Sequence, residues 1–183
     1  FLGEMRQLEF KAGPLLVQLP PSFAFDLDLV DRFLTALRTR WSGPVAVEPR
    51  HVSWFTGEAD ELLIAHCAAR VAADPARTEA AAEPGGWPGL VYVRLHGSPR
   101  TYYSSYDDNY LAALADRLRD AAAADATDQV WCIFDNTASG AALQNALDMK
   151  RLLLGEAEPP AFAAPRLRYF EPQPRERPEH SHG

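Results

Sequence analysis

Five short apolar runs recur along the chain, and each has about the length of a buried β-strand and ends in polar residues. The runs are residues 14–20 (PLLVQLP), 44–51 (PVAVEPRH), 69–75 (ARVAADP), 90–97 (LVYVRLHG) and 129–136 (QVWCIFDN). Most of them are followed by a segment with helical periodicity. Because strands and helices alternate, the pattern predicts parallel strands joined by right-handed crossovers.

Four helices are expected between and after these runs, from apolar residues at helical spacing within 27–37, 62–67, 111–118 and 142–153. Asp26 and Asp107 are favourable N-cap residues for the first and third helices, and Gly155 closes the fourth. Residues 76–89 are rich in Gly and Pro near their end, so we interpret this connection as a loop with at most one helical turn.

The choice of fold lies between an open doubly wound sheet and a closed barrel. No Gly-rich phosphate-binding fingerprint follows any of the apolar runs, which disfavours a dinucleotide-binding sheet. A complete barrel of this kind needs about 250 residues, and the chain has 183. The sequence therefore predicts an incomplete (β/α)8 TIM-type barrel over residues 1–170, with N-terminal strands missing.

The two ends of the chain carry separate expectations. The chain begins at Phe1 in the middle of a pattern, which is typical of a fragment. Residues 171–183 are rich in Pro and charge and are predicted to be a disordered tail, in which His180 and His182 are solvated rather than metal-bound.

Alternation along the strands predicts which side chains face the barrel interior, since the helix-facing set must be apolar. In residues 90–97, Val91, Val93 and Leu95 then face the helices. The polar residues predicted to face the interior near the carboxyl ends of the strands are Gln18, Glu48, Arg50, Asp74, Arg94, His96 and either Asp135 or Asn136. In barrels of this class that end of the strands carries the active site. These residues form either such a site or a structural layer of ion pairs.

Several of these segments resemble one known family. GPVAVEPRHVSW, VYVRLHGSPRTYYSSYDDNYLAALADRL, VWCIFDNTASGAALQNALDMKRLL and PLLVQLPPSF are similar to signature segments of the YecE-like family, number seventy-two among domains of unknown function. The resemblance covers most of residues 13–154. It implies a (β/α)8 barrel with no established activity, of which this chain would be the C-terminal part.

The residue types suggest acid–base chemistry on an anion. Glu48, His96 and Asp135 are the predicted catalytic residues, because a carboxylate beside an imidazole suits proton transfer near neutrality. The predicted substrate-binding residues are Gln18, Arg50, His51, Asp74, Arg94, Tyr106, Asn136, Ser139 and Gly140. The arginines suit carboxylate or phosphate, and the turn at Ser139 is either a backbone anion site or a simple helix cap.

The loop after residues 90–97 adds further candidates. Tyr102, Tyr103 and Tyr106 could stack on a sugar or base, or simply pack within the loop. A divalent metal held by Glu48, His96 and Asp74 or Asp135 is a disfavoured alternative, because two arginines are close by. No cofactor is expected.

These features favour a hydrolase, lyase or isomerase acting on a small phosphorylated or sugar-like anion. A non-catalytic anion-binding module and an interaction scaffold are the alternatives. The net charge of −7 argues against nucleic-acid binding, and no run approaches the roughly 20 apolar residues of a membrane span. The charged N-terminal residues and two separate cysteines, Cys67 and Cys132, predict a cytoplasmic protein with buried, reduced thiols.

Overall fold

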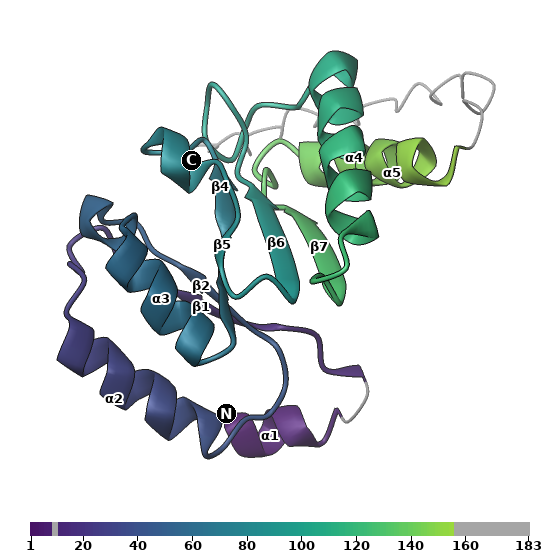
Figure 1. Cartoon of the computed structure of the whole chain (residues 1–183). Coiled ribbons are helices and arrows are strands. Elements are labelled where there is room, and N and C mark those ends of the chain that lie inside the picture. Colours follow the sequence, from purple (N-terminus) through teal and green to yellow (C-terminus); the bar gives the residue numbers. More distant parts are fainter. Residues whose placement is uncertain (9–10, 156–183) are drawn as a thin grey trace, which may run out of the picture.

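The computed structural model describes residues 1–8 and 11–155, and the predicted tail at 171–183, with His180 and His182, lies outside the described residues. All five apolar runs contain strands (Figure 1). The strands are β1 (Leu15–Gln18), β2 (Val45–Glu48), β3 (Ala68–Arg70), β4 (Ala72–Asp74), β6 (Leu90–Leu95) and β7 (Gln129–Phe134).

The strands pair in parallel and in chain order. β1 pairs with β2 and β2 with β3 in one sheet, whereas β4 pairs with β6 and β6 with β7 in a second sheet. The run at 69–75 contributes to both sheets, because Val71 separates β3, in the first sheet, from β4, in the second. The Val71 N–H donates to the Val47 carbonyl of β2 at 2.9 Å. The described residues therefore form a mixed α/β structure of two open sheets, without a closed barrel among them.

The predicted helices are α2 (Leu27–Arg38), α3 (Gly57–Ala65), α4 (Asp108–Ala123) and α5 (Ala141–Leu154). Asp26 and Asp107 cap α2 and α4 as predicted, and each side chain accepts a hydrogen bond from a backbone N–H in the first turn. α5 ends at Gly155, which has the left-handed φ of 66° expected of a helix-terminating glycine.

Short elements complete the structure. α1 (Leu2–Arg6) and the 3₁₀ helix η2 (Val52–Trp54) were not predicted. The predicted loop at 76–89 contains the single 3₁₀ turn η3 (Glu79–Ala81), as expected, and also the two-residue strand β5 (Gly85–Gly86), which pairs antiparallel to β3. Within the described chain, no helix is long and apolar enough to cross a membrane.

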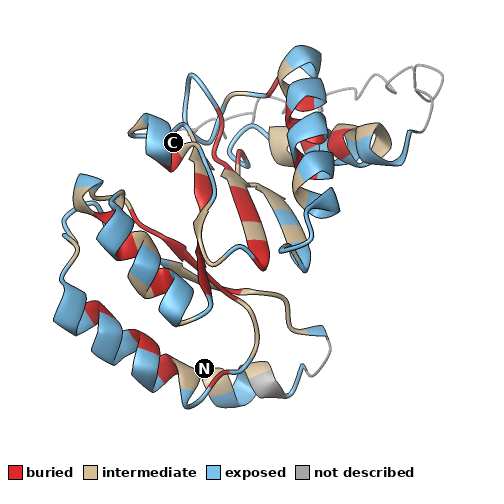
Figure 2. Ribbon diagram, in the orientation of Figure 1, coloured by how far each residue is buried: buried red, intermediate tan, exposed pale blue. Residues whose placement is uncertain are grey.

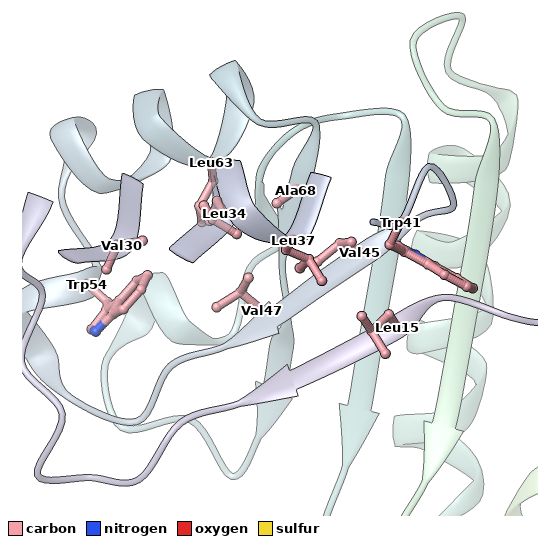
Figure 3. Close-up of a cluster of buried hydrophobic side chains, with 10 residues drawn as sticks. All are labelled: Leu15, Val30, Leu34, Leu37, Trp41, Val45, Val47, Trp54, Leu63 and Ala68. Atoms are coloured by element: carbon pink, nitrogen blue, oxygen red, sulfur yellow. The ribbon is translucent and has the colours of Figure 1, made fainter. Parts of the chain in front are cut away.

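Three apolar clusters show which way the strands face. Figure 3 shows the first, in which Val45 and Val47 of β2 pack against Val30, Leu34 and other residues of the helices. A second cluster packs Val93 and Leu95 of β6 under α4 and α5. The third contains no helical residue and comprises Ala46, Ala69, Val71, Leu90 and Tyr92. β2 is buried from both sides, which Figure 2 shows as continuous red along this strand.

The predicted alternation is thus confirmed for β2 and β6 but is wrong for residues 69–75. Val71 lies in the third cluster, away from the helices, whereas Ala72 lies in the helix-covered cluster. Asp74 pairs in register with Leu95, so it is on the helix-covered face, opposite to the prediction. The reason is that small apolar side chains fill both faces of this strand, so apolarity does not mark one of them.

The cysteines also differ from prediction in part. Both are free, but Cys67 is exposed and Cys132 is only partly buried, whereas both were predicted to be buried. α3 ends at Ala65, and Cys67 takes a left-handed φ of 51° in the turn that leads into β3.

Candidate functional site

Six of the predicted residues meet at the carboxyl ends of the strands, and we call them the carboxyl-end cluster. Its members are Gln18, Glu48, Arg50, Arg94, His96 and Asp135. Gln18 and Glu48 end β1 and β2, whereas His96 and Asp135 follow β6 and β7 directly. Because parallel strands end at the same edge, residues up to 76 positions apart in the sequence come into contact, as Gln18 and Arg94 do.

Glu48 is the centre of the cluster. Its Oε1 forms an ion pair with Arg50 Nη2 at 2.6 Å and lies 2.9 Å from His96 Nε2, and its Oε2 accepts a hydrogen bond from Arg94 Nη1 at 2.6 Å. The residue is 0% exposed. Burial alone would raise its pKa, but the hydrogen bonds from His96 and Arg94 and the charges of both arginines hold the pKa below its usual value. Glu48 is therefore an ionised, fully engaged carboxylate.

His96 lies between two carboxylates. Its Nδ1 is 3.0 Å from Asp135 Oδ2 and its Nε2 is 2.9 Å from Glu48 Oε1, while the ring is 1% exposed. A neutral imidazole can donate to one of these carboxylates, whereas an imidazolium donates to both. The side chain of Asp135 is 29% exposed, so it is the solvent-facing end of this row.

The two arginines surround the carboxylates. Arg94 donates to Gln18 Oε1 and Glu48 through Nη1, and to Asp135 Oδ2 through Nη2 at 2.9 Å. Its burial lowers its pKa, but the adjacent carboxylates outweigh this and raise the pKa. Arg50 Nη2 also lies 2.9 Å from His96 Nε2. Its Nε is buried and has no hydrogen-bond partner in the part of the chain that the structure describes.

The charges of the cluster are balanced. Two guanidinium groups face two carboxylates, so the cluster has no net formal charge when His96 is neutral. Ion pairs at this depth stabilise a protein only when their geometry satisfies most of the hydrogen-bonding groups, as it does here for Glu48.

Four of the predicted binding residues lie outside the carboxyl-end cluster and instead anchor the loop of residues 97–107 by polar contacts. They are Asp74, Tyr106, Asn136 and Ser139. Tyr106 is buried on the helix-covered side, where its hydroxyl donates to Asp74 Oδ1 at 2.7 Å and accepts from the Gly97 N–H. Burial and the neighbouring Asp74 raise the pKa of Tyr106. Ser139 Oγ donates to the Tyr103 carbonyl at 2.6 Å. Asp74 was therefore wrongly predicted to face the interior with Arg94, and Tyr106, predicted to bind substrate, packs within the loop.

The ambiguity between Asp135 and Asn136 is resolved by their contacts. Asp135 belongs to the carboxyl-end cluster, whereas Asn136 is buried and donates to the Ser104 carbonyl and to Asn145 Oδ1, both at 2.9 Å. Asn136 thus anchors the loop. Asp74, one of the ligands considered for a metal with Glu48 and His96, is on the opposite face from them.

The remaining predicted residues have local roles. His51 Nδ1 caps η2 by accepting from the Ser53 N–H, and it also contacts the Ser53 hydroxyl at 2.8 Å. Gly140, with a left-handed φ of 77°, is the N-cap residue of α5. Within residues 1–8 and 11–155, no group of three or more His, Cys, Asp or Glu side chains could hold a metal ion.

Sequence reasoning missed Asn145. Its side chain, in α5, accepts from the Tyr106 N–H and from Asn136, and donates to the Tyr106 carbonyl. The available signal was an amide on the apolar face of a helix, three or four residues from Ala142 and Met149. A polar residue at such a position requires internal hydrogen bonds.

The structure defines the chain as an α/β protein of parallel strands with a charged cluster at their carboxyl ends. A family model described as "Protein of unknown function DUF72" matches residues 1–168. The chain therefore belongs to the DUF72 family, which is the YecE-like family.

Solved structures of DUF72 family proteins are similar to this chain. One from Enterococcus faecalis has 25% identity and a TM-score of 0.67, covering 84% of this chain and 66% of its own. One from Thermotoga maritima has 25% identity and a TM-score of 0.65, covering 83% and 64%. A second Enterococcus faecalis structure, at 22% identity and a TM-score of 0.67, is matched over 65% of its length, so the chain spans about two thirds of these relatives. A search of curated proteins finds no match.

Proposed function

We propose that the described strands are part of the wall of a (β/α)8 barrel, whose remaining strands lie outside this chain. The parallel strands follow one another in chain order, whereas in a doubly wound sheet the order reverses. The helices pack on one side, and the helix-free third cluster would be the barrel interior. Trp131 of β7 supports a curved wall, because its ring lies next to Gly13, just before β1: a Cβ on Gly13 would be 2.9 Å from the ring.

We further propose that the carboxyl-end cluster binds a small anion, phosphorylated or sugar-like, and transfers protons on it. Asp135 is the group that exchanges a proton with the ligand, because it is the more exposed carboxylate. His96 passes or stabilises that proton through Nδ1. Glu48 is fully engaged by protein groups, so we assign it the task of positioning His96 and the arginines.

The observation that carries the proposal is the buried imidazole between one buried and one solvent-facing carboxylate. A layer of ion pairs that only stabilised the fold would not require an imidazole to connect Glu48 with Asp135. Buried ion pairs are also no more stabilising than apolar side chains of similar volume. The buried Arg50 Nε lacks a partner among the described residues, and such an unsatisfied donor calls for a group that the chain itself does not supply here.

The arrangement supports reactions in which a proton moves. Hydrolysis, elimination and isomerisation each require a proton donor or acceptor at the reacting group, and an adjacent guanidinium stabilises developing negative charge. The proposed enzyme is thus a hydrolase, lyase or isomerase. A non-catalytic anion-binding module is the alternative, favoured by the fact that the protein itself already pairs both carboxylates.

The test combines binding with turnover. A panel of phosphate, sugar phosphates and small carboxylates would be titrated by calorimetry and followed by NMR for consumption. We expect binding by the wild type, weaker binding by Arg50→Met, and loss of turnover but not of binding in Asp135→Asn. Asp116→Asn, which alters an exposed pair with Arg119, is the control. Binding without turnover would favour the module, and unchanged binding in Arg50→Met would refute the proposed site.

A further inference from the structure

Tyr102 lies beside the carboxyl-end cluster, on the loop of residues 97–107. Its ring stands edge-on to the imidazole of His96, with the ring centroids 5.9 Å apart and the planes at 88°. The residue is 44% exposed. The loop therefore places a large aromatic surface next to the buried imidazole and leaves much of it open to solvent.

The backbone of Tyr102 is held in an unfavourable conformation. Its φ is 69°, in the left-handed region that side chains with a Cβ avoid at a cost of about 1–2 kcal/mol. Two backbone hydrogen bonds fix it there: its N–H donates to the His96 carbonyl, and its own carbonyl accepts from the Ala138 N–H. Such strain persists only where the surroundings impose it, and it is concentrated at functional sites.

The surroundings here are the buried contacts of the loop. Gly97 has a φ of 93°, and a Cβ at this position would lie 2.9 Å from the Ser104 carbonyl oxygen, so the loop folds back tightly. Tyr106 holds the C-terminal end of the loop by hydrogen bonds to Asp74 and Gly97. The buried amides of Asn136 and Asn145 bind its backbone between these points.

Packing does not explain why Tyr102 remains exposed. Tyr106, on the same loop, is 6% exposed and belongs to an apolar cluster. Tyr103 is about as exposed as Tyr102, but the Arg100 guanidinium lies 3.9 Å from its ring centroid and occupies one face of the ring. Tyr102 combines strain, exposure and contact with His96. An aromatic surface held in this way suits contact with the apolar face of a ring.

We propose that Tyr102 determines specificity by packing against the ring of a cyclic anionic ligand, such as a sugar phosphate, whose anionic group binds at the arginines. This inference rests on the proposed function of the carboxyl-end cluster. It goes further by requiring a ring beside the anionic group. Tyr102 would then contribute to affinity for the ring but not to affinity for the anion alone.

The test compares two probes, inorganic phosphate and glucose 6-phosphate, titrated by calorimetry under the same conditions. We expect the wild type to bind glucose 6-phosphate more tightly than phosphate. Tyr102→Ala should weaken glucose 6-phosphate binding by about two- to tenfold, the range typical of one aromatic contact, and leave phosphate binding unchanged. Tyr102→Phe should retain the preference, and Tyr103→Ala is the matched control on the same loop.

A second variant separates specificity from folding. Tyr102→Gly removes the ring but relieves the left-handed strain, so its Tm should not fall below that of the wild type while its preference for glucose 6-phosphate is lost. A marked fall in Tm with unchanged preference would show a structural role and overturn the inference. Binding of phosphate without any gain from the ring would also overturn it, yet leave the proposed function intact. Failure of both probes to bind would refute both.

Discussion

Substitution of Glu48 by Gln removes the charge at the centre of the carboxyl-end cluster while keeping the shape of the side chain. In the wild type, this carboxylate accepts a hydrogen bond from Arg94 at 2.6 Å, forms an ion pair with Arg50 at 2.6 Å and lies 2.9 Å from His96 Nε2. A neutral amide offers one acceptor in place of two charged oxygens and adds a donor that faces other donors. Two guanidinium groups would then lose their principal counter-charge.

The expected cost is large, because Glu48 is fully buried. Removing one partner of a buried ion pair typically costs about 3–5 kcal/mol. For a chain of 150–250 residues, each kcal/mol lowers Tm by about 2–4 °C, so Glu48→Gln should lower Tm by about 6–20 °C. Since natural domains are stable by about 5–15 kcal/mol, most of the molecules should remain folded at 25 °C.

The free energy of unfolding would be measured by urea titration at pH 7, with circular dichroism as the signal. Glu83→Gln is the matched control, because Glu83 pairs with Arg117 at the surface, where such pairs contribute little. A double variant, Glu48→Gln with Arg94→Gln, should cost less than the sum of the two single changes, because the arginine is no longer left unpaired. A Glu48→Gln protein as stable as the Glu83→Gln control would refute the assignment of Glu48 as the centre of the cluster.

Two further predictions concern titration. The pKa of Glu48 is lower in the folded than in the unfolded chain, so its stabilising contribution is complete above about pH 4.3 and is lost as the pH falls through the folded-state pKa. Between pH 6 and pH 3, the unfolding free energy should therefore decrease more steeply for the wild type than for Glu48→Gln, and parallel curves would contradict this. Burial raises the pKa of Cys132 to about 12, whereas Cys67 is exposed. Ellman's reagent at pH 8 should thus modify one thiol rapidly and the second much more slowly. Cys67→Ser should abolish the rapid phase, and two equally fast thiols would argue against the raised pKa of Cys132.

Much of the fold was predictable, because the strand and helix patterns are strong along most of the chain. β2 and β6 combine regularly spaced branched residues on one face with Glu48, Arg94 and His96 on the other, so their alternation identifies the two faces. The caps at Asp26 and Asp107 were predictable because they depend only on neighbouring backbone groups. The parallel arrangement then brings the polar strand ends together.

The errors occurred where the sequence lacks contrast or where a partner is distant. Residues 69–73 are mostly alanine and valine, so neither face of this strand is marked and Asp74 was assigned to the wrong side. β5 contains only Gly85 and Gly86, which form a strand because β3 is beside them. The role of Asn145 depends on a loop 39 residues earlier in the chain, and no local pattern indicates that contact.

The balance of charge in the carboxyl-end cluster affects how a ligand would arrive. The guanidinium and carboxylate groups cancel one another locally, and the whole chain is acidic, with a net charge of −7. An anion diffusing toward the protein is therefore not steered by long-range attraction, and added salt should not slow its encounter. Proteins that bind the phosphate backbone of nucleic acids through unpaired basic patches behave in the opposite way, because salt weakens their binding steeply. Discrimination between ligands would depend instead on short-range contacts made after binding begins. At that stage the anion must replace the carboxylates that are paired with Arg50 and Arg94.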